Sequence, residues 1–305
     1  MQGFRELTVA DVRRLLSEDF PELHVESLRQ LPGPETWVWV LNEELVFRFP
    51  RAEFRRRRAR VDVEAHVIAA LQETSAGRAY VPSIDYVSPR GYSGQRFARG
   101  VTGEKRRPPP DAWPQLAADV RSLLTAVHAT PPPVGVELEP LPDPDELLER
   151  ARADAQASGV DPFALGSPPE VGGDPVLCHG DTKPEHFLLD VHDRLAWAID
   201  WADACVAHPV RDLWGIVLWL GPAFARLVDP EHADAATFYA RCSAVVNVAR
   251  DVRGERDAPP VYAQLQAPSA LRPLIGSHCR RFGQERRSRS SPTSVADRRE
   301  ARAPA

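Results

Sequence analysis

The sequence predicts an α+β fold in two lobes, a small antiparallel sheet with one main helix followed by a larger, mostly helical lobe. Three observations predict this fold. Segments rich in Val, Trp and Phe, which are typical of strands, gather in the first hundred residues. One long helical pattern, residues 58–73, lies among them. From residue 115 onward helical patterns dominate, and only two short apolar strands, 186–190 and 195–200, fall between them.

The smaller lobe, expected to span residues 1–100, opens with a predicted helix over residues 8–20. Thr8 suits the N-cap position of this helix, and apolar residues recur after it at helical spacing. The strands that follow are rich in β-branched and aromatic residues, and the turn sequence LPGPE joins the first two. They are predicted at residues 24–31, 36–42, 44–50, 80–88 and 94–103.

The larger lobe, expected to span residues 101–275, begins with a Pro-rich break. Its helices are predicted at residues 115–129, 144–158, 210–228 and 234–252. The last residues, 276–305, carry eight Arg against three acids and almost no large apolar side chain. Such a segment cannot bury enough surface to order itself, so we expect a disordered tail there. A contact between this basic tail and nucleic acid is the alternative.

The composition is that of an ordinary globular protein. The 305 residues are 43% hydrophobic and 27% charged, with a formal net charge of −5. No apolar run approaches the roughly 20 residues of a membrane-spanning helix, and the N-terminus lacks the apolar core of a signal peptide. We therefore expect a cytoplasmic protein without a membrane partner. The four cysteines are scattered without a Cys-x-x-Cys pair, which argues against a zinc site and a disulfide framework.

One segment concentrates side chains that carry chemistry. His179, Gly180 and Asp181 are followed after four residues by His186, then by an apolar strand and Asp200. Phosphoryl transfer needs an acid that orients an attacking hydroxyl, ligands for Mg²⁺, and cations along the phosphates. The spacing matches the His-Arg-Asp and Asp-Phe-Gly motifs with which protein kinases meet these needs, except that His stands where their Asn ligand would be.

The segments HGDTKPEHFLLD and IDWADACVAHPVRDL resemble the signature of the aminoglycoside phosphotransferase family, the small-molecule branch of the protein-kinase-like fold. Pro209 and Asp212 fit the DP…DL segment of that family. The resemblance implies a protein-kinase-like, two-lobed enzyme with its hinge at about residues 97–104. It implies transfer of the γ-phosphate of ATP or GTP, with Mg²⁺, to a hydroxyl of a small molecule, as in antibiotic-resistance kinases. We expect such an enzyme to act as a monomer.

The resemblance assigns roles to four residues of the motif segment. Asp181 would be the catalytic base, and His186 and Asp200 would be the metal ligands. His186 departs from the common Asn, and Mg²⁺ prefers oxygen ligands, although some family branches, including macrolide kinases, carry His there. Lys183 is one of only two lysines in the chain. It matches a Lys of serine/threonine kinases that meets the transferring phosphate, where a cation stabilises developing charge; a solvated lysine is the alternative.

The resemblance places the nucleotide in the smaller lobe. The loop from Gly33 to Thr36 corresponds to the loop that covers the phosphates, although it contains a single Gly between two prolines. Arg48 stands where the third strand of the fold carries a phosphate-binding Lys, and Glu64 in the following helix is its expected partner. Glu53 is the alternative partner. Arg can replace Lys because its guanidinium also binds phosphate, with two parallel hydrogen bonds.

The sequence is compatible with several classes of acceptor. The acid-rich stretch 137–154 would attract polycationic aminoglycosides, and a solvated helix start with acids at its N-terminus is the alternative. The apolar run 214–224 would line a groove for macrolides, or else pack in the core. A metabolite such as an amino alcohol or a sugar is a further candidate. We favour an aminoglycoside or a related antibiotic.

Two other classes of function compete with catalysis. Arg48, the Gly-poor loop and the unusual tail would suit a non-catalytic, nucleotide-binding remnant, whereas the set of Asp181, His186 and Asp200 favours an active kinase. Nucleic-acid binding through the arginines of the 51–60 tract is disfavoured, because the chain without its tail carries a net charge of about −10. We interpret that tract as a solvated loop.

Overall fold

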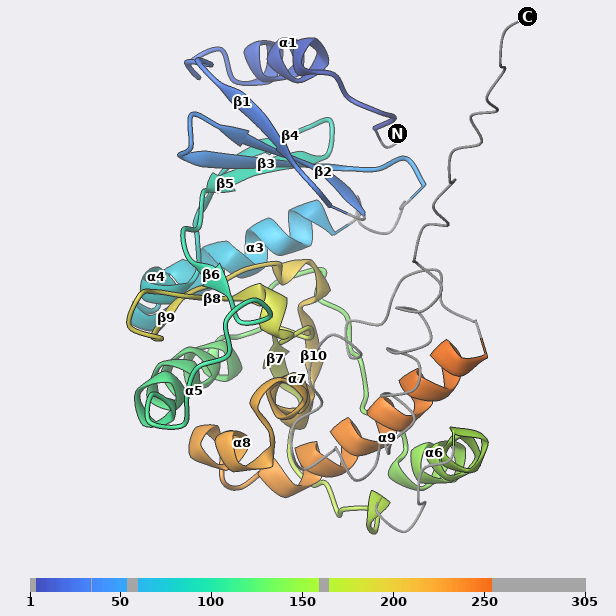
Figure 1. Cartoon of the computed structure of the whole chain (residues 1–305). Helices are drawn as coiled ribbons and strands as arrows, with labels where there is room; N and C mark the ends of the chain where they lie inside the picture. Colours follow the sequence, from blue (N-terminus) through green and yellow to red (C-terminus); the bar gives the residue numbers. More distant parts are fainter. Residues whose placement is uncertain (1–3, 34, 54–59, 159–164, 254–305) are drawn as a thin grey trace, which may run out of the picture.

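The computed structural model describes residues 4–33, 35–53, 60–158 and 165–253. It has two lobes, one built on a sheet and the other largely helical (Figure 1), which confirms the predicted α+β division. The predicted disordered tail, 276–305, lies outside the described residues. Within the described ranges, no helix combines the length and the apolar character that crossing a membrane requires.

A five-stranded antiparallel sheet forms the core of the smaller lobe, in the order β1-β2-β3-β5-β4. Helix α1 (Val9–Asp19) covers one face of it (Figure 1), and its apolar side chains pack against aromatic residues of the strands. The expected strand over 94–103 is wrong, because the chain there forms the end of β5 and then the separate strand β6 (Val101–Thr102). The sheet consists of β1 (Leu28–Leu31), β2 (Thr36–Leu41), β3 (Leu45–Pro50), β4 (Ile84–Ser88) and β5 (Tyr92–Arg96).

The start of α1 confirms the predicted N-cap. The hydroxyl oxygen of Thr8 accepts a hydrogen bond from the N–H of Asp11 at 3.2 Å, and the Asp11 carboxylate accepts one from the N–H of Thr8 at 3.0 Å. This capping box satisfies N–H groups that the first turn of a helix leaves without an intrahelical partner. It therefore fixes where α1 begins above the sheet.

Strand β3 and helix α3 (Val61–Gln72) form the side of the smaller lobe that faces the larger one (Figure 1). Phe47 and Phe49 are fully buried in the cluster under α1. Because side chains alternate along a strand, Arg48 points to the opposite face, toward α3. A short helix, α4 (Ser75–Tyr80), then follows where no helix is expected from the sequence.

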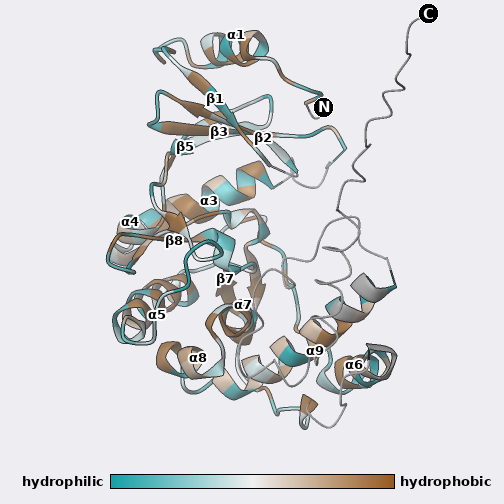
Figure 2. Ribbon diagram, in the orientation of Figure 1, coloured by the Kyte–Doolittle hydropathy of each residue, from teal (hydrophilic) through white to brown (hydrophobic). Residues whose placement is uncertain are grey.

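Helices α5 to α9 build the larger lobe, and α7 at its centre is largely buried and apolar (Figure 2). The expected single helix over 210–228 is wrong. Gly221, with φ of 94°, ends α7, and Pro222 begins α8, because Gly adopts positive φ readily and Pro suits the first turn of a helix. The helices are α5 (Trp113–Ala129), α6 (Pro144–Ser158), α7 (Val210–Leu220), α8 (Pro222–Val228) and α9 (Ala233–Val252).

Two small sheets flank the motif segment. Strand β6 pairs with β8 (Phe187–Leu189), which pairs with β9 (Leu195–Ala198). Strands β7 (Val176–Cys178) and β10 (Cys205–Ala207) form an antiparallel pair in which Cys178 lies opposite Cys205. The sequence predicts β8 and β9, which are short apolar runs, but misses β7 and β10. The motif residues lie in the connections between these strands.

Candidate active site

The turn after β7 fixes the backbone that presents Asp181. The Asp212 carboxylate, in the first turn of α7, accepts hydrogen bonds from the N–H groups of His179 at 3.0 Å and Gly180 at 2.9 Å. Gly180 has φ of 80°, and a Cβ at this position would lie 2.1 Å from the carbonyl oxygen of Asp203. Only glycine fits there, so the turn depends both on Gly180 and on the buried acid of α7.

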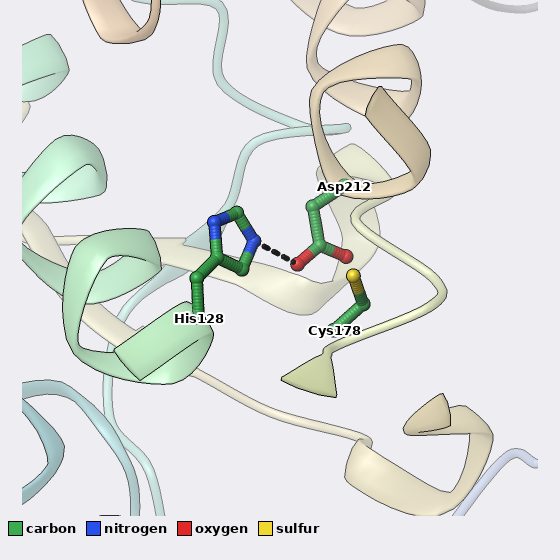
Figure 3. Close-up of side chains that lie close together, drawn as sticks. All are labelled: His128, Cys178 and Asp212. Atoms are coloured by element: carbon green, nitrogen blue, oxygen red, sulfur yellow. Dashed lines mark hydrogen bonds and ion pairs between the residues drawn. The ribbon is translucent and has the colours of Figure 1, made fainter. Parts of the chain in front are cut away.

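Asp212 is fully buried beside His128 and Cys178 (Figure 3). The Nε2–H of His128 donates to its carboxylate at 3.1 Å. Burial opposes the ionisation of Asp212, but the hydrogen bond and charge of His128, together with the N–H of Gly180, hold the pKa of Asp212 below its ordinary value. Burial raises the pKa of the Cys178 thiol, which therefore stays protonated. Although these residue types bind metals elsewhere, the Asp212 oxygens are already engaged, so we assign this cluster a structural role.

Replacing Asp212 with Asn should destabilise the protein by about 3 kcal/mol, because the amide turns a donor toward backbone N–H groups that then lose a buried partner. The pKa of Asp212 is lower in the folded state than in the unfolded state. The charged carboxylate therefore contributes fully to the free energy of unfolding above the unfolded pKa of about 3.9. This contribution is lost as the pH falls through the lower pKa of the folded state. Urea unfolding at neutral pH measures the change, with the exposed Asp62→Asn as control. An unfolding midpoint equal to that of the control would show that the turn does not depend on Asp212.

The structure brings Asp181, Lys183 and His186 together. Lys183 Nζ lies 2.9 Å from Oδ2 of Asp181, and His186 Nδ1 lies 3.6 Å from the same oxygen. The N–H of Asp181 donates to Nδ1 of His179 at 3.3 Å, and Nε2–H of His179 donates to the carbonyl oxygen of Ile199 at 3.1 Å. Burial lowers the pKa of His179, so its ring stays neutral in this single tautomer. Asp181 is therefore held at both its backbone and its side chain.

His186 and Asp200 face each other, with His186 Nε2 and Asp200 Oδ2 3.6 Å apart. The other ring nitrogen of His186, Nδ1, donates to the carbonyl oxygen of Asp181 at 2.7 Å. A carbonyl only accepts, so in the neutral ring the lone pair lies on Nε2, toward Asp200. Metal-binding histidines are usually oriented by such a second hydrogen bond, and the carboxylate offers the oxygen that Mg²⁺ prefers. These two residues therefore fit a Mg²⁺ ion.

Arg48 joins the smaller lobe to Asp200. Its Nη1 lies 2.7 Å from Oε1 of Glu64, and its Nη2 lies 2.7 Å from Oδ1 of Asp200. The Glu64 side chain is only 5% exposed and also accepts the N–H of Trp201 at 3.2 Å. Burial disfavours the charged guanidinium, but the two carboxylates hold the pKa of Arg48 above its ordinary value. The structure thus pairs Arg48 with Glu64 and adds a contact to Asp200 that the sequence does not predict, whereas Glu53 is exposed.

The loop from Gly33 to Thr36 is described except for residue 34. The Gly33 carbonyl accepts a hydrogen bond from Nη2 of Arg51 at 2.7 Å, and the Arg51 guanidinium lies 3.9 Å from the ring centre of Trp37. A Cβ on Gly33 would lie 2.6 Å from the carbonyl oxygen of Thr36, so the turn has no room for a larger residue. Arg51 therefore positions this loop, and its role over the phosphates stays a prediction.

A family model described as the phosphotransferase enzyme family matches residues 34–245, which is more than half of the chain. The chain belongs to this family. The match covers both lobes and includes Asp181, His186, Asp200 and Arg48. No curated protein matches the chain in sequence.

Solved phosphotransferases share the fold of this family member. The GDP and kanamycin complex of an APH(2″) enzyme has a TM-score of 0.63 and 19% identity, over 92% of this chain and 99% of that chain. The macrolide 2′-phosphotransferase MphH from Brachybacterium faecium has a TM-score of 0.60 and 19% identity, over 86% and 99%. The streptomycin and ATP complex of APH(2″)-IIa has a TM-score of 0.58 and 17% identity, over 82% and 94%. At these sequence identities the structural similarity establishes the fold. It is the protein-kinase-like fold that the sequence predicts.

A cavity of about 410 Å³ opens beside Asp181 in this phosphotransferase, and we name it the Asp181 pocket. Its walls come from the motif segment, α6 and its preceding loop, α7 and α9. Of the acid-rich stretch 137–154, only Pro142, Leu147 and Arg150 line it, so the acids of that stretch are not among its lining residues. Part of the apolar run predicted to line a groove, including Trp214, does line it.

A second contact between the lobes of the phosphotransferase escapes the sequence analysis. Arg60, just before α3, donates to the carbonyl oxygen of Ala202 at 3.0 Å and pairs with Asp203 at 2.8 Å. The interpretation of 51–60 as a solvated loop is therefore wrong for Arg51 and Arg60, which are bound, and the other arginines of the tract lie outside the described residues. No local pattern marks Arg60, because its partners Ala202 and Asp203 are more than a hundred residues away.

Replacing Arg48 with Ala should raise the nucleotide KM strongly, whereas Arg48→Lys should retain or raise activity. Without the cation, Glu64 and Asp200 lose their shared counter-charge, and breaking a buried charge pair on one side typically costs about 3–5 kcal/mol. Even half of that changes kcat/KM by more than about tenfold. Steady-state kinetics with varied nucleotide measure the effect, and a double-mutant cycle with Glu64→Ala should show coupling. An unchanged rate and nucleotide KM in Arg48→Ala would place the phosphate-binding cation elsewhere, first at Arg51.

Proposed function

We propose that this phosphotransferase moves the γ-phosphoryl group of ATP or GTP to a hydroxyl group of a small molecule. One observation carries the proposal. A continuous set of short contacts runs from Glu64 and Arg48 in the smaller lobe, through Asp200 and His186, to Asp181 at the edge of a cavity. Phosphoryl transfer depends mainly on such positioning of charges around the phosphate.

Each residue has a role in the proposed reaction. The acceptor oxygen forms a bond to the γ-phosphorus while the bond to the β–γ bridging oxygen breaks, and Asp181 receives the hydroxyl proton. Lys183, beside Asp181, offsets negative charge that develops on the transferring group. Arg48, held by Glu64, binds phosphate oxygens, and the loop from Gly33 to Thr36 covers them.

His186 and Asp200 would hold Mg²⁺ in this proposal. When bound, the ion would supply positive charge that offsets the negative charge of the phosphates. The residues themselves prepare the site: the Asp181 carbonyl orients the His186 ring, and Arg48 fixes one oxygen of Asp200 and leaves Oδ2 facing the ring.

The acceptor is proposed at the level of a chemical class. Structures that share the fold contain kanamycin or gentamicin, and two are of macrolide 2′-phosphotransferases, which supports an antibiotic such as an aminoglycoside first and a macrolide second. A metabolite with an alcohol group is the alternative. We propose a monomeric enzyme of the cytoplasm, whose activity would confer resistance if an antibiotic is the acceptor.

Nucleotide turnover tests this proposal. ATP and GTP are each incubated with Mg²⁺ and with aminoglycosides, macrolides, tuberactinomycin peptides, sugars, amino alcohols or hydroxy acids, and diphosphate release is followed. We expect turnover with at least one acceptor, and a rate about a thousandfold lower in Asp181→Asn. If the protein binds Mg-nucleotide but turns it over no faster than Asp181→Asn with every acceptor, the result would favour the non-catalytic, nucleotide-binding remnant.

A further inference from the structure

Asp200 lies in a backbone conformation that residues other than glycine rarely adopt. Its φ of 65° and ψ of 67° place it in the left-handed region, where the Cβ atom crowds the following carbonyl oxygen. Such a residue persists only where the surrounding structure holds it. The contacts of the chain on either side of Asp200 therefore decide where its carboxylate points.

The chain before Asp200 is held from within the larger lobe. The N–H of Ile199 donates to the carbonyl oxygen of His186 at 2.9 Å. The chain after Asp200, residues 201–203, forms a single 3₁₀ turn. This turn lies in contact with α3 of the smaller lobe, so part of what holds Asp200 comes from the other lobe.

Two side chains at the start of α3 hold the 201–203 turn. The carboxylate of Glu64 accepts the N–H of Trp201 at 3.2 Å. The Nη1 of Arg60 donates to the carbonyl oxygen of Ala202 at 3.0 Å. Arg60 and Glu64 are four residues apart, and the N–H of Glu64 donates to the carbonyl oxygen of Arg60 at 2.8 Å. They therefore lie on one side of the helix, and each holds a different peptide group of the turn.

Arg60 also pairs with two acids of the larger lobe. Its Nη1 lies 2.8 Å from Oδ1 of Asp203, and its Nη2 lies 3.8 Å from Oε1 of Glu139. The Arg60 side chain is 28% exposed, and its two partners are more exposed than that. Exposed ion pairs add little to the stability of a whole protein. The main consequence of these contacts is therefore local, because they fix where the turn lies.

The position of the 201–203 turn affects two parts of the site. Asp200 directly precedes the turn, and Oδ2 of Asp200 faces Nε2 of His186 at 3.6 Å. The carbonyl oxygen of Asp203 lies so close to Gly180 that a Cβ there would be 2.1 Å from it. A shift of the turn would therefore displace the expected metal ligand and disturb the backbone that presents Asp181.

We propose that Arg60 is a positioning residue of the metal site. It holds residues 201–203 against α3, so that Asp200 keeps its left-handed conformation and its Oδ2 stays opposite His186. Arg48 contacts the other oxygen of Asp200, but in the proposed reaction Arg48 also binds phosphate, whereas Arg60 acts on the backbone of the turn. The inference rests on the proposed function, since it takes Asp200 as a ligand of Mg²⁺.

Hydrogen exchange followed by mass spectrometry tests the position of the turn without nucleotide or metal. Arg60→Met keeps a long apolar side chain and removes its hydrogen-bond donors. Peptides that cover residues 200–204 should exchange about fivefold faster in this variant, as expected when one hydrogen bond that opposes local opening is lost. Arg60→Lys keeps a donor and should restore part of the protection. Unchanged exchange in Arg60→Met would overturn the inference.

Arg14→Met is the matched control for this experiment. Arg14 forms an exposed ion pair with Glu18 at 3.2 Å on α1, so its replacement also removes an arginine from a surface pair. The exchange of the peptides that cover residues 200–204 should be the same in this control as in the wild type. Because exposed pairs add little stability, Arg14→Met and Arg60→Met should share one urea unfolding midpoint.

A second test separates the positioning of a metal ligand from a general structural role. Calorimetry measures the affinity for ATP and for GTP, each with Mg²⁺ and with EDTA. Arg60→Met should lower the affinity for Mg-nucleotide by about tenfold, as loss of a residue that supports a metal ligand does, and the affinity with EDTA by less than about twofold. Arg60→Lys should recover most of the loss. An equal loss with and without Mg²⁺, or no loss, would contradict the inference.

The wild-type protein in the same calorimetry distinguishes this inference from the proposed function. If the wild type binds Mg-nucleotide and Arg60→Met binds it as tightly, only the positioning role is wrong. If the wild type binds neither nucleotide with Mg²⁺, the proposed function is wrong, and the exchange rates alone decide whether Arg60 positions the turn.

Discussion

Replacing Asp181 with Asn is expected to lower kcat by about a thousandfold, within the range that a positioned general base contributes. Asn has the same shape, but its amide cannot accept the hydroxyl proton. The structure predicts that little else changes. Lys183 can donate to the amide oxygen as it does to the carboxylate, and the turn is held through backbone N–H groups that bond to Asp212.

The measurement needs turnover, stability and nucleotide affinity from one preparation. Asp62→Asn, an exposed acid on α3, is the matched control. We expect Asp181→Asn to keep the unfolding midpoint and the affinity for Mg-nucleotide of the wild type. Turnover within a factor of a few of the control would show that another group takes the proton.

Replacing Asp200 with Ala should remove Mg²⁺-dependent nucleotide binding, with a loss of affinity of at least about a hundredfold. Mutation of a residue that only supports a metal ligand typically lowers metal affinity or activity by about 10–100-fold. Losing a ligand itself should lower the affinity by more. The substitution also takes from Arg48 one of its two carboxylate partners and leaves only Glu64. Both effects should lower the affinity for the nucleotide.

His186→Asn is the informative companion to Asp200→Ala, because it exchanges the imidazole of a proposed ligand for an amide. The amide oxygen is a harder donor than a ring nitrogen, so Mg²⁺ binding should persist and activity should remain. Calorimetry with nucleotide, with Mg²⁺ and then with EDTA, measures both variants. If Asp200→Ala binds Mg-nucleotide as the wild type does, Asp200 is not the metal ligand.

The part of the site that lies in one stretch of chain could be predicted from sequence. Asp181, Lys183, His186 and Asp200 fall within twenty residues, and the strands β8 and β9 between the last two bring His186 and Asp200 face to face. The resemblance of its strand to the third strand of the family placed Arg48, and the alternation with Phe47 and Phe49 predicted the face on which it lies. The same resemblance gave Glu64 as its expected partner, with Glu53 as the alternative.

Contacts between distant segments could not be predicted in the same way. Asp119 on α5 is buried and accepts two hydrogen bonds from the Arg194 guanidinium, at 2.6 and 2.5 Å, yet nothing near Asp119 in the sequence marks it. The bond from Arg48 to Asp200 spans more than 150 residues. Which residues of α6 line the Asp181 pocket depends likewise on how this helix packs against α9.

The same limit applies to the fold. A long helical pattern predicts a helix well, as for α5 and α9, whose expected ranges nearly coincide with the observed ones. Within such a pattern, a Gly–Pro pair at 221–222 is a weak local signal that divides 210–228 into two helices. Short strands such as β7 and β10 form because neighbouring segments hold them in place, and they leave no periodicity to recognise.

The burial of Cys178 opposite Cys205 shields the larger lobe from alkylating reagents. The thiolate is the reactive form of cysteine, and burial raises the pKa of Cys205 and of Cys242 to about 12 and that of Cys178 further. No cysteine precedes residue 178 in the chain. With Cys279 replaced by Ser, iodoacetamide can therefore react only where the larger lobe has opened. The rate of its incorporation would measure how often the larger lobe opens, whereas the smaller lobe, which contains no cysteine, would not react.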